Sequence, residues 1–86
     1  MRNSQEMVQP LQTAFVMVNC QAGHESDVIE QLRSIKGIKE AIRTSGPYDI
    51  LCNIEASTVE SLREIIEQKI RKIPDLISTT TLIKSY

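Results

Sequence analysis

Aromatic residues are scarce in this sequence, and so are other features that mark particular classes of function. Only 3% of the 86 residues are aromatic and none is tryptophan, so stacking platforms for single-stranded nucleic acid are not predicted. The formal net charge of −1 disfavours direct DNA binding, which requires a basic excess. No apolar run approaches the ~20 residues of a membrane span, and the polar N-terminus does not resemble a signal peptide. We therefore expect a cytoplasmic protein.

Residues that could carry catalysis or hold a metal are also few. Cys20 and Cys52 match no C-x-x-C spacing and cannot form a disulfide framework, so a reduced intracellular protein is favoured. Buried free cysteines usually act as small apolar residues, and a metal or redox role is the weaker alternative. His24 has no neighbours at metal-ligand spacing. We predict no catalytic residue, no metal site and no cofactor.

Along the sequence, segments with the apolar pattern of β-strands alternate with segments that have the apolar pattern of helices. Runs rich in β-branched residues predict strands at 13–20, 38–45, 49–56 and 77–85. An apolar stripe predicts a helix at 25–36. A second helix begins at the capping-box pattern from Ser57 to Glu60 and stops at Pro74. Residues 1–12 show no period, which predicts a flexible N-terminal arm before one domain at 13–86.

The order βαββαβ predicts a ferredoxin-like α+β fold. Its four-stranded antiparallel sheet carries both helices on one face, because each crossover is right-handed. Alternation along 13–20 and 49–56 leaves Phe15, Met17 and Leu51 on the opposite, uncovered face. Such an apolar patch is unfavourable in water, so we expect dimerisation through these three side chains.

The loop between the second and third strands combines turn residues with binding groups. Gly46-Pro47-Tyr48-Asp49 is typical of a β-turn with Pro at its second position. The Asp49 side chain has two possible roles at this point. It accepts a backbone N–H and stabilises the turn, or it binds a ligand.

Four segments of the sequence resemble one family. These segments are AFVMVNC, GHESDVIEQLRSIKGIKEA, TSGPYDILCNIEA and ISTTTLI, and together they are similar to the effector-binding (RAM) domain of the Lrp/AsnC regulators over about residues 13–84. The full-length regulators carry an N-terminal helix-turn-helix domain, for which residues 1–12 leave no room. The resemblance therefore implies a stand-alone RAM protein that forms dimers and larger rings and does not bind DNA.

The resemblance also implies a ligand and a site. Family members hold an amino acid between dimers, which maps here to Gly46, Tyr48 and Asp49 in the loop, with Thr79 and Thr81 in the last strand as weaker candidates. A carboxylate accepts from the ligand's ammonium, while loop N–H groups and threonine hydroxyls donate to its carboxylate. The threonines have an ordinary alternative role as strand residues.

Three functions remain in competition at the level of the sequence. The first is a non-enzymatic amino-acid-binding homo-oligomer that modulates transcriptional regulation or amino-acid metabolism, through ligand-dependent assembly or association with full-length Lrp/AsnC-type regulators. The second is a small enzyme on the same fold, since fold alone does not define function. The third is a structural partner of regulators that binds no ligand.

Overall fold

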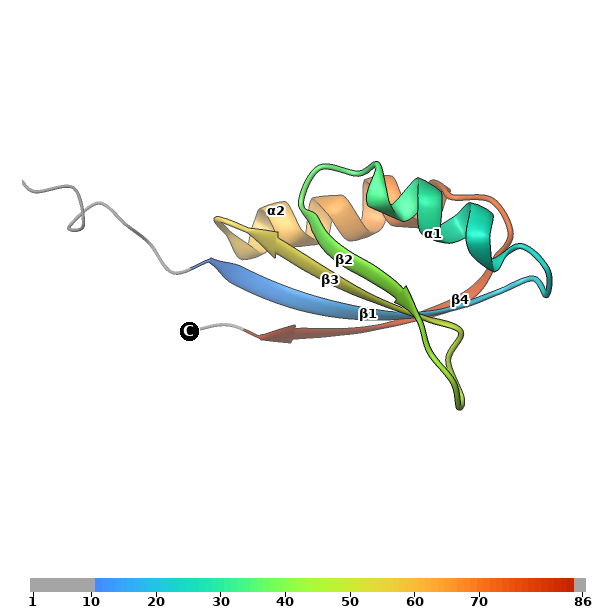
Figure 1. The fold of residues 1–86 in the computed structure, drawn as a ribbon. Coiled ribbons are helices and arrows are strands. Elements are labelled where there is room, and N and C mark those ends of the chain that lie inside the picture. The colour runs from blue at the N-terminus through green and yellow to red at the C-terminus, as the bar shows by residue number, and fades with distance from the viewer. Residues whose placement is uncertain (1–10, 85–86) are drawn as a thin grey trace, which may run out of the picture.

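The computed structural model describes residues 11–84, which follow the order βαββαβ (Figure 1). The strands are β1 (Gln12–Cys20), β2 (Ile38–Arg43), β3 (Ile50–Ala56) and β4 (Leu76–Lys84). The helices are α1 (Glu25–Arg33) and α2 (Val59–Glu64). The second helix continues as a π-helical segment, η2 (Ile65–Lys69), and a 3₁₀ turn, η3 (Ile70–Lys72).

The strands form one antiparallel sheet in the order β2-β3-β1-β4. Figure 1 shows both helices on one face of this sheet, with the other face bare. The predicted ferredoxin-like α+β architecture is therefore confirmed. Because β1 and β3 are the central strands, residues on their helix-facing side are covered by α1 and α2, whereas β2 and β4 form the two edges.

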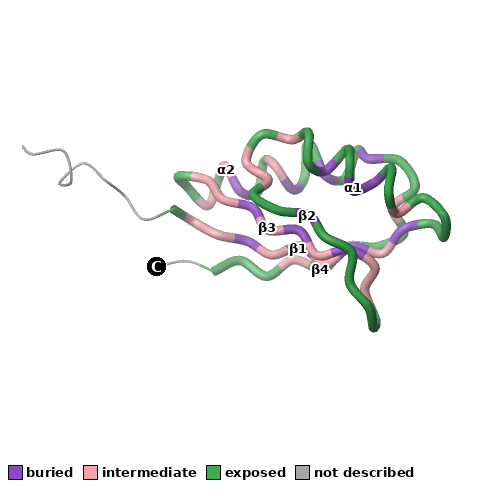
Figure 2. The backbone as a smooth tube through the Cα atoms, viewed as in Figure 1, coloured by how far each residue is buried: buried purple, intermediate pink, exposed green. Residues whose placement is uncertain are grey.

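The core lies between the sheet and the helices. Burial alternates along β1 and β3 (Figure 2), as a sheet with one covered face requires. Val16, Val18 and Cys52 are buried on the helix side, while Phe15 and Met17 are only half-buried on the bare side. The two faces that the alternation predicts are both observed.

The ends of the first helix and the second strand differ from the predicted limits. The helix predicted at 25–36 ends at Arg33, because the Ser34 hydroxyl donates to the Gln31 carbonyl at 2.7 Å and the following turn tightens. The strand predicted at 38–45 ends at Arg43. Thr44 begins the loop, and its N–H donates to the Asp49 carbonyl at 2.9 Å across the base of the hairpin.

The second helix begins one residue later than the capping pattern predicts. Thr58, not Ser57, is the N-cap, and its Oγ1 accepts from the Ser61 N–H at 3.0 Å. Thr58 has the extended backbone that a cap requires. At the other end Ile73 is extended before Pro74, as the residue preceding a proline prefers.

The predicted N-terminal arm and last strand are displaced by one residue. Gln12 belongs to β1 and pairs with Ala56, so the arm predicted at 1–12 does not extend to this residue. Residues 1–10 lie outside the described part of the chain, as does Ser85 of the strand predicted at 77–85. That strand spans Leu76–Lys84.

Candidate functional site

The β2–β3 loop, residues 44–49, is the most prominent projection of the described chain. It extends past the sheet on the side away from the helices (Figure 1), and most of its residues are exposed (Figure 2). Gly46 has φ of +104°, a conformation that suits glycine. The Thr44 hydroxyl donates to the Tyr48 carbonyl at 2.7 Å and closes the loop.

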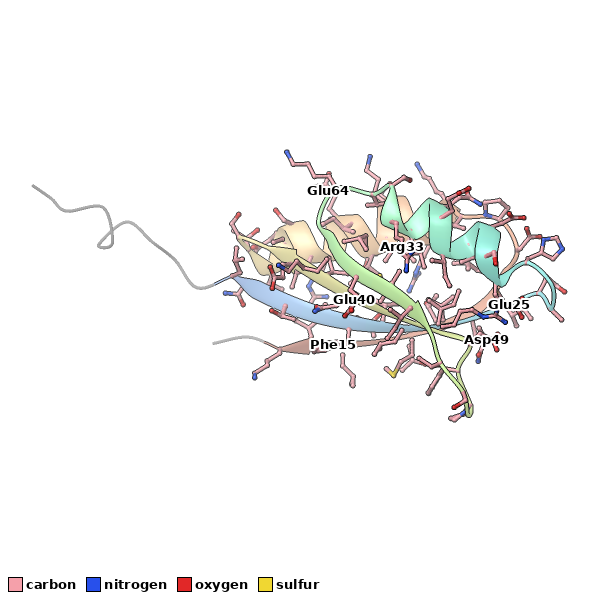
Figure 3. All side chains as sticks on the ribbon, in the orientation of Figure 1. Phe15, Glu25, Arg33, Glu40, Asp49 and Glu64 are labelled. Carbon is pink, nitrogen blue, oxygen red and sulfur yellow. The ribbon has the colours of Figure 1, made fainter. Side chains whose placement is uncertain are left out.

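Asp49 is fixed at the base of this loop by the neighbouring strand β1 (Figure 3). Its Oδ2 accepts from the Cys20 N–H at 3.0 Å, and its own N–H donates to the Val18 carbonyl at 3.0 Å and to Asn19 Oδ1 at 3.1 Å. The carboxylate therefore has the backbone-accepting role that its residue type suggests, although the donor lies in β1. A carboxylate accepts several hydrogen bonds, so this contact leaves acceptor capacity.

A polar row continues from Asp49 across the end of the bare face. Asn19 lies opposite Ser78 in β4, and its Nδ2 donates to Ser78 Oγ at 3.5 Å. The sequence placed Asn19 on the uncovered face but gave it no role. The signal was its position at the end of β1, because an antiparallel partner brings that end beside the loop after β2.

Thr79 and Thr81 lie on the other face of the sheet from Asn19 and Ser78. They pair with Val18 and Val16, whose side chains point to the helices. Each threonine borders a hollow beside the second helix, and neither hollow includes Gly46, Tyr48 or Asp49. The five residues proposed from the sequence thus form two separate groups within one chain.

The bare face carries a continuous apolar surface. Phe15, Met17 and Leu51 are half-buried there, and two more exposed side chains extend the surface to both edge strands. Leu82 pairs with Phe15, and Ile42 pairs with Leu51. Asn53 Oδ1, also on this face, is buried and accepts no hydrogen bond within residues 11–84.

The two thiols lie in the core and are poor nucleophiles. Cys52 pairs with Val16 and Cys20 with Leu76, so the two are not cross-strand partners. Burial raises the pKa of the Cys52 thiol to about 12. Burial, and then the nearby Asp49 carboxylate, also raise the pKa of Cys20. Since the thiolate is the reactive form, both thiols are unreactive near neutral pH.

Two further classes of site are not found within residues 11–84. No group of three or more His, Cys, Asp or Glu side chains in this part of the chain is arranged to hold a metal ion. None of the described helices is long and apolar enough to cross a membrane. The exposed features of the described chain are the loop, the bare face and the edge of β4.

Comparison with known proteins identifies the family. The model of the Lrp/AsnC ligand binding domain matches residues 13–84. The chain belongs to this family. A solved structure of a hypothetical protein from Pyrococcus horikoshii has the same fold, with a TM-score of 0.82 and 36% identity over 87% of this chain and 90% of that one.

Two curated proteins contain segments similar to this Lrp/AsnC domain. An uncharacterised helix-turn-helix-type transcriptional regulator of Pyrococcus furiosus is 30% identical over 83% of this chain and 49% of its own length. A homocitrate synthase of Sulfurisphaera tokodaii is 38% identical over 79% of this chain. The match spans 15% of the synthase, so the chain resembles a part of an enzyme as well as a part of a regulator.

Proposed function

We propose that this Lrp/AsnC domain is a non-enzymatic, cytoplasmic effector-binding module that holds a free α-amino acid between chains. The observation that carries the proposal is the exposed β2–β3 loop with Asp49 fixed at its base by Cys20 and Val18. Because the Asp49 carboxylate is already held in place, a ligand that binds to it loses less free energy in ordering this side chain.

The chemistry of the loop suits one half of an amino acid. The Asp49 carboxylate accepts from the ligand's ammonium group, and loop N–H groups at Gly46 and Tyr48 donate to its carboxylate. Thr79 and Thr81 lie on the opposite side of the sheet. In this proposal they serve the site from a second chain, so the ligand bridges subunits and its binding is linked to assembly.

Dimerisation through the bare face is the second part of the proposal. Phe15, Met17 and Leu51 form its centre, and Leu82 widens the apolar surface. A second bare face would remove these side chains from water, which is the dominant favourable term in association. Asn53 Oδ1 would then receive a donor from the partner. Ring-like assemblies of such dimers bring the loops of different dimers together.

The two curated relatives suggest two biological settings for this module. The homocitrate synthase is named as an enzyme and the other as a transcriptional regulator, and a similar segment in both supports a role shared by the two settings. We propose that amino-acid binding here reports amino-acid supply, either to full-length Lrp/AsnC-type regulators through mixed assembly or to an enzyme of amino-acid metabolism.

The test is a thermal-shift screen across the free amino acids with parallel size-exclusion chromatography. A ligand at 100 times its dissociation constant adds about 2.7 kcal/mol to the free energy of unfolding. We expect such a shift, together with a change in assembly size. Asp49→Asn keeps an oxygen acceptor for the Cys20 N–H, so it should retain the fold and lose the shift.

Asp27→Asn serves as the matched control, because Asp27 is an exposed acid in α1 and lies outside the loop. This variant should keep the full ligand shift. If no amino acid shifts the parent protein, a structural-partner role replaces the proposal. An equal shift for Asp49→Asn and the parent leaves Asp49 with only its contact to β1.

A further inference from the structure

The two edges of the sheet differ in how they are protected. On the β2 edge, Arg33 of α1 donates to the Ala41 carbonyl from Nε at 3.2 Å and from Nη2 at 2.8 Å; Figure 3 shows Arg33 reaching from the helix towards this strand. The strand has only six residues, and its register shifts between Ile38 and Glu40. A short, irregular edge with an occupied carbonyl resists addition of another strand.

The β4 edge is longer and less protected within the described chain, although its register with β1 also shifts once, opposite Asn19 and Cys20. It is a strand of nine residues that pairs on one side only, with β1. Residues 76–83 carry no charge, and Ile77 and Leu82 are 61% and 60% exposed. The backbone groups on the outer side of a long uncharged edge strand form a template for a further strand.

A groove runs between this edge and the second helix. It consists of two adjoining hollows, with volumes of about 290 and 230 Å³, which share Arg71. We call it the edge groove, and its other lining residues are Arg63, Ile66, Glu67, Thr81 and Ile83 in the first hollow and Leu76, Ile77, Ser78 and Thr79 in the second. A groove between an edge strand and a helix is suited to recognition of an extended peptide by strand addition.

Within the described part of the chain, the charged groups of the edge groove are without partners. The side chains of Arg63, Glu67 and Arg71 make no ion pair or hydrogen bond within residues 11–84, although each arginine stands four positions from Glu67. The intervening π-helical segment η2 changes the usual spacing of helical side chains, and π turns occur often at functional sites. Two guanidinium groups against one carboxylate leave the groove with a net positive charge.

From these observations we infer that the edge groove takes an extended, acidic segment of a partner protein as a fifth strand beside β4. The segment's backbone pairs with the outer edge of β4. Its acidic side chains point towards the second helix and meet Arg63 and Arg71, while the alternate, apolar side chains point to the bare face beside Leu82. This interaction uses none of the loop residues Gly46, Tyr48 and Asp49. Thr79 and Thr81, which the proposed amino-acid site takes from a second chain, also line the edge groove.

The experiment titrates the protein with a short acetylated and amidated peptide, no longer than β4, in which valine and glutamate alternate. We expect a dissociation constant below about 1 mM, with amide chemical-shift changes and slowed solvent exchange concentrated in Leu76–Lys84. Arg71→Glu should weaken binding at least about tenfold. Lys72→Glu is the matched control, since Lys72 is exposed on the same helix and lies outside the edge groove, and it should bind like the parent.

Three outcomes would overturn this inference. The first is equal binding of a peptide with lysine in place of every glutamate. The second is absence of binding, or shift changes that map to β2 or to the β2–β3 loop. The third is protection of the β4 amides without peptide that rises with protein concentration, which would mean that a second copy of the chain occupies the edge. Circular dichroism of Arg71→Glu confirms that the variant is folded before it is compared.

Discussion

Gly37 connects the end of α1 to β2 with a backbone conformation that favours glycine. Its φ is +102°, and its carbonyl accepts from the Glu55 N–H at 2.9 Å. A Cβ atom added here would lie 2.6 Å from Ile65 Cδ1 in the second helix. One residue therefore fixes both a chain reversal and the distance between two elements.

We expect Gly37→Ala to destabilise the protein more than Gly23→Ala. Both positions have positive φ, for which an L-residue costs about 1–2 kcal/mol. Only at position 37 must the end of Ile65 also move, whereas a Cβ at position 23 meets nothing within 4 Å. Urea denaturation of both variants measures the difference. Equal losses of stability would show that the Ile65 contact adds nothing.

For single residues, the sequence predicts the face on which a side chain lies but not its hydrogen-bond partner. Alternation along β1 and β3 predicts which side chains face the helices, because each strand has one covered face. The same reasoning could not show that Asp49 accepts from Cys20 in β1, since that contact depends on the exact position of the loop base. The family resemblance assigned Thr79 and Asp49 to one site. The register pairs Thr79 with Val18, so Thr79 points to the helix side of the sheet, away from the loop site.

The second helix shows what determines structure at the scale of an element. Its buried residues Leu62, Ile66 and Ile70 recur every four positions. In an α-helix such a stripe rotates by about 40° per step, and the wider π-helical turn keeps the three side chains on one side. The stripe predicts a helix, but no proline or glycine lies within residues 59–72 to indicate that its geometry changes.

The start of this helix provides a test of its cap. The Thr58 Oγ1 accepts from the Ser61 N–H, so Thr58→Ala should lower the free energy of unfolding by about 1 kcal/mol. Ser57→Ala, one residue earlier, should change it by less than about 0.5 kcal/mol. Thermal and urea unfolding of the two variants provide the measurement. A larger effect at Ser57 would restore the capping box that the sequence indicates.

At the scale of the whole molecule, the sheet has one covered face and one bare face. The covered face holds the buried core of the described chain, in which no polar side chain is buried. The bare face combines half-buried apolar residues with the buried, unpaired Asn53 Oδ1. The alternating pattern predicts that such a face exists. It cannot show what covers the face, because in the proposed dimer the covering residues belong to another chain.

We expect the parent protein to be at least a dimer at micromolar concentration and Leu82→Glu to shift it towards the monomer. Leu82 pairs with Phe15 on the bare face and is 60% exposed, so a charge there should leave the single chain folded and be unfavourable only when a partner covers it. Light scattering coupled to size-exclusion chromatography measures the mass. Ile77→Glu provides a control of equal exposure at the register shift near the end of β4, and it should keep the parent's mass. A strictly monomeric parent would rule out pairing of the bare faces, and an unchanged mass for Leu82→Glu would place the dimer contact elsewhere on the molecule.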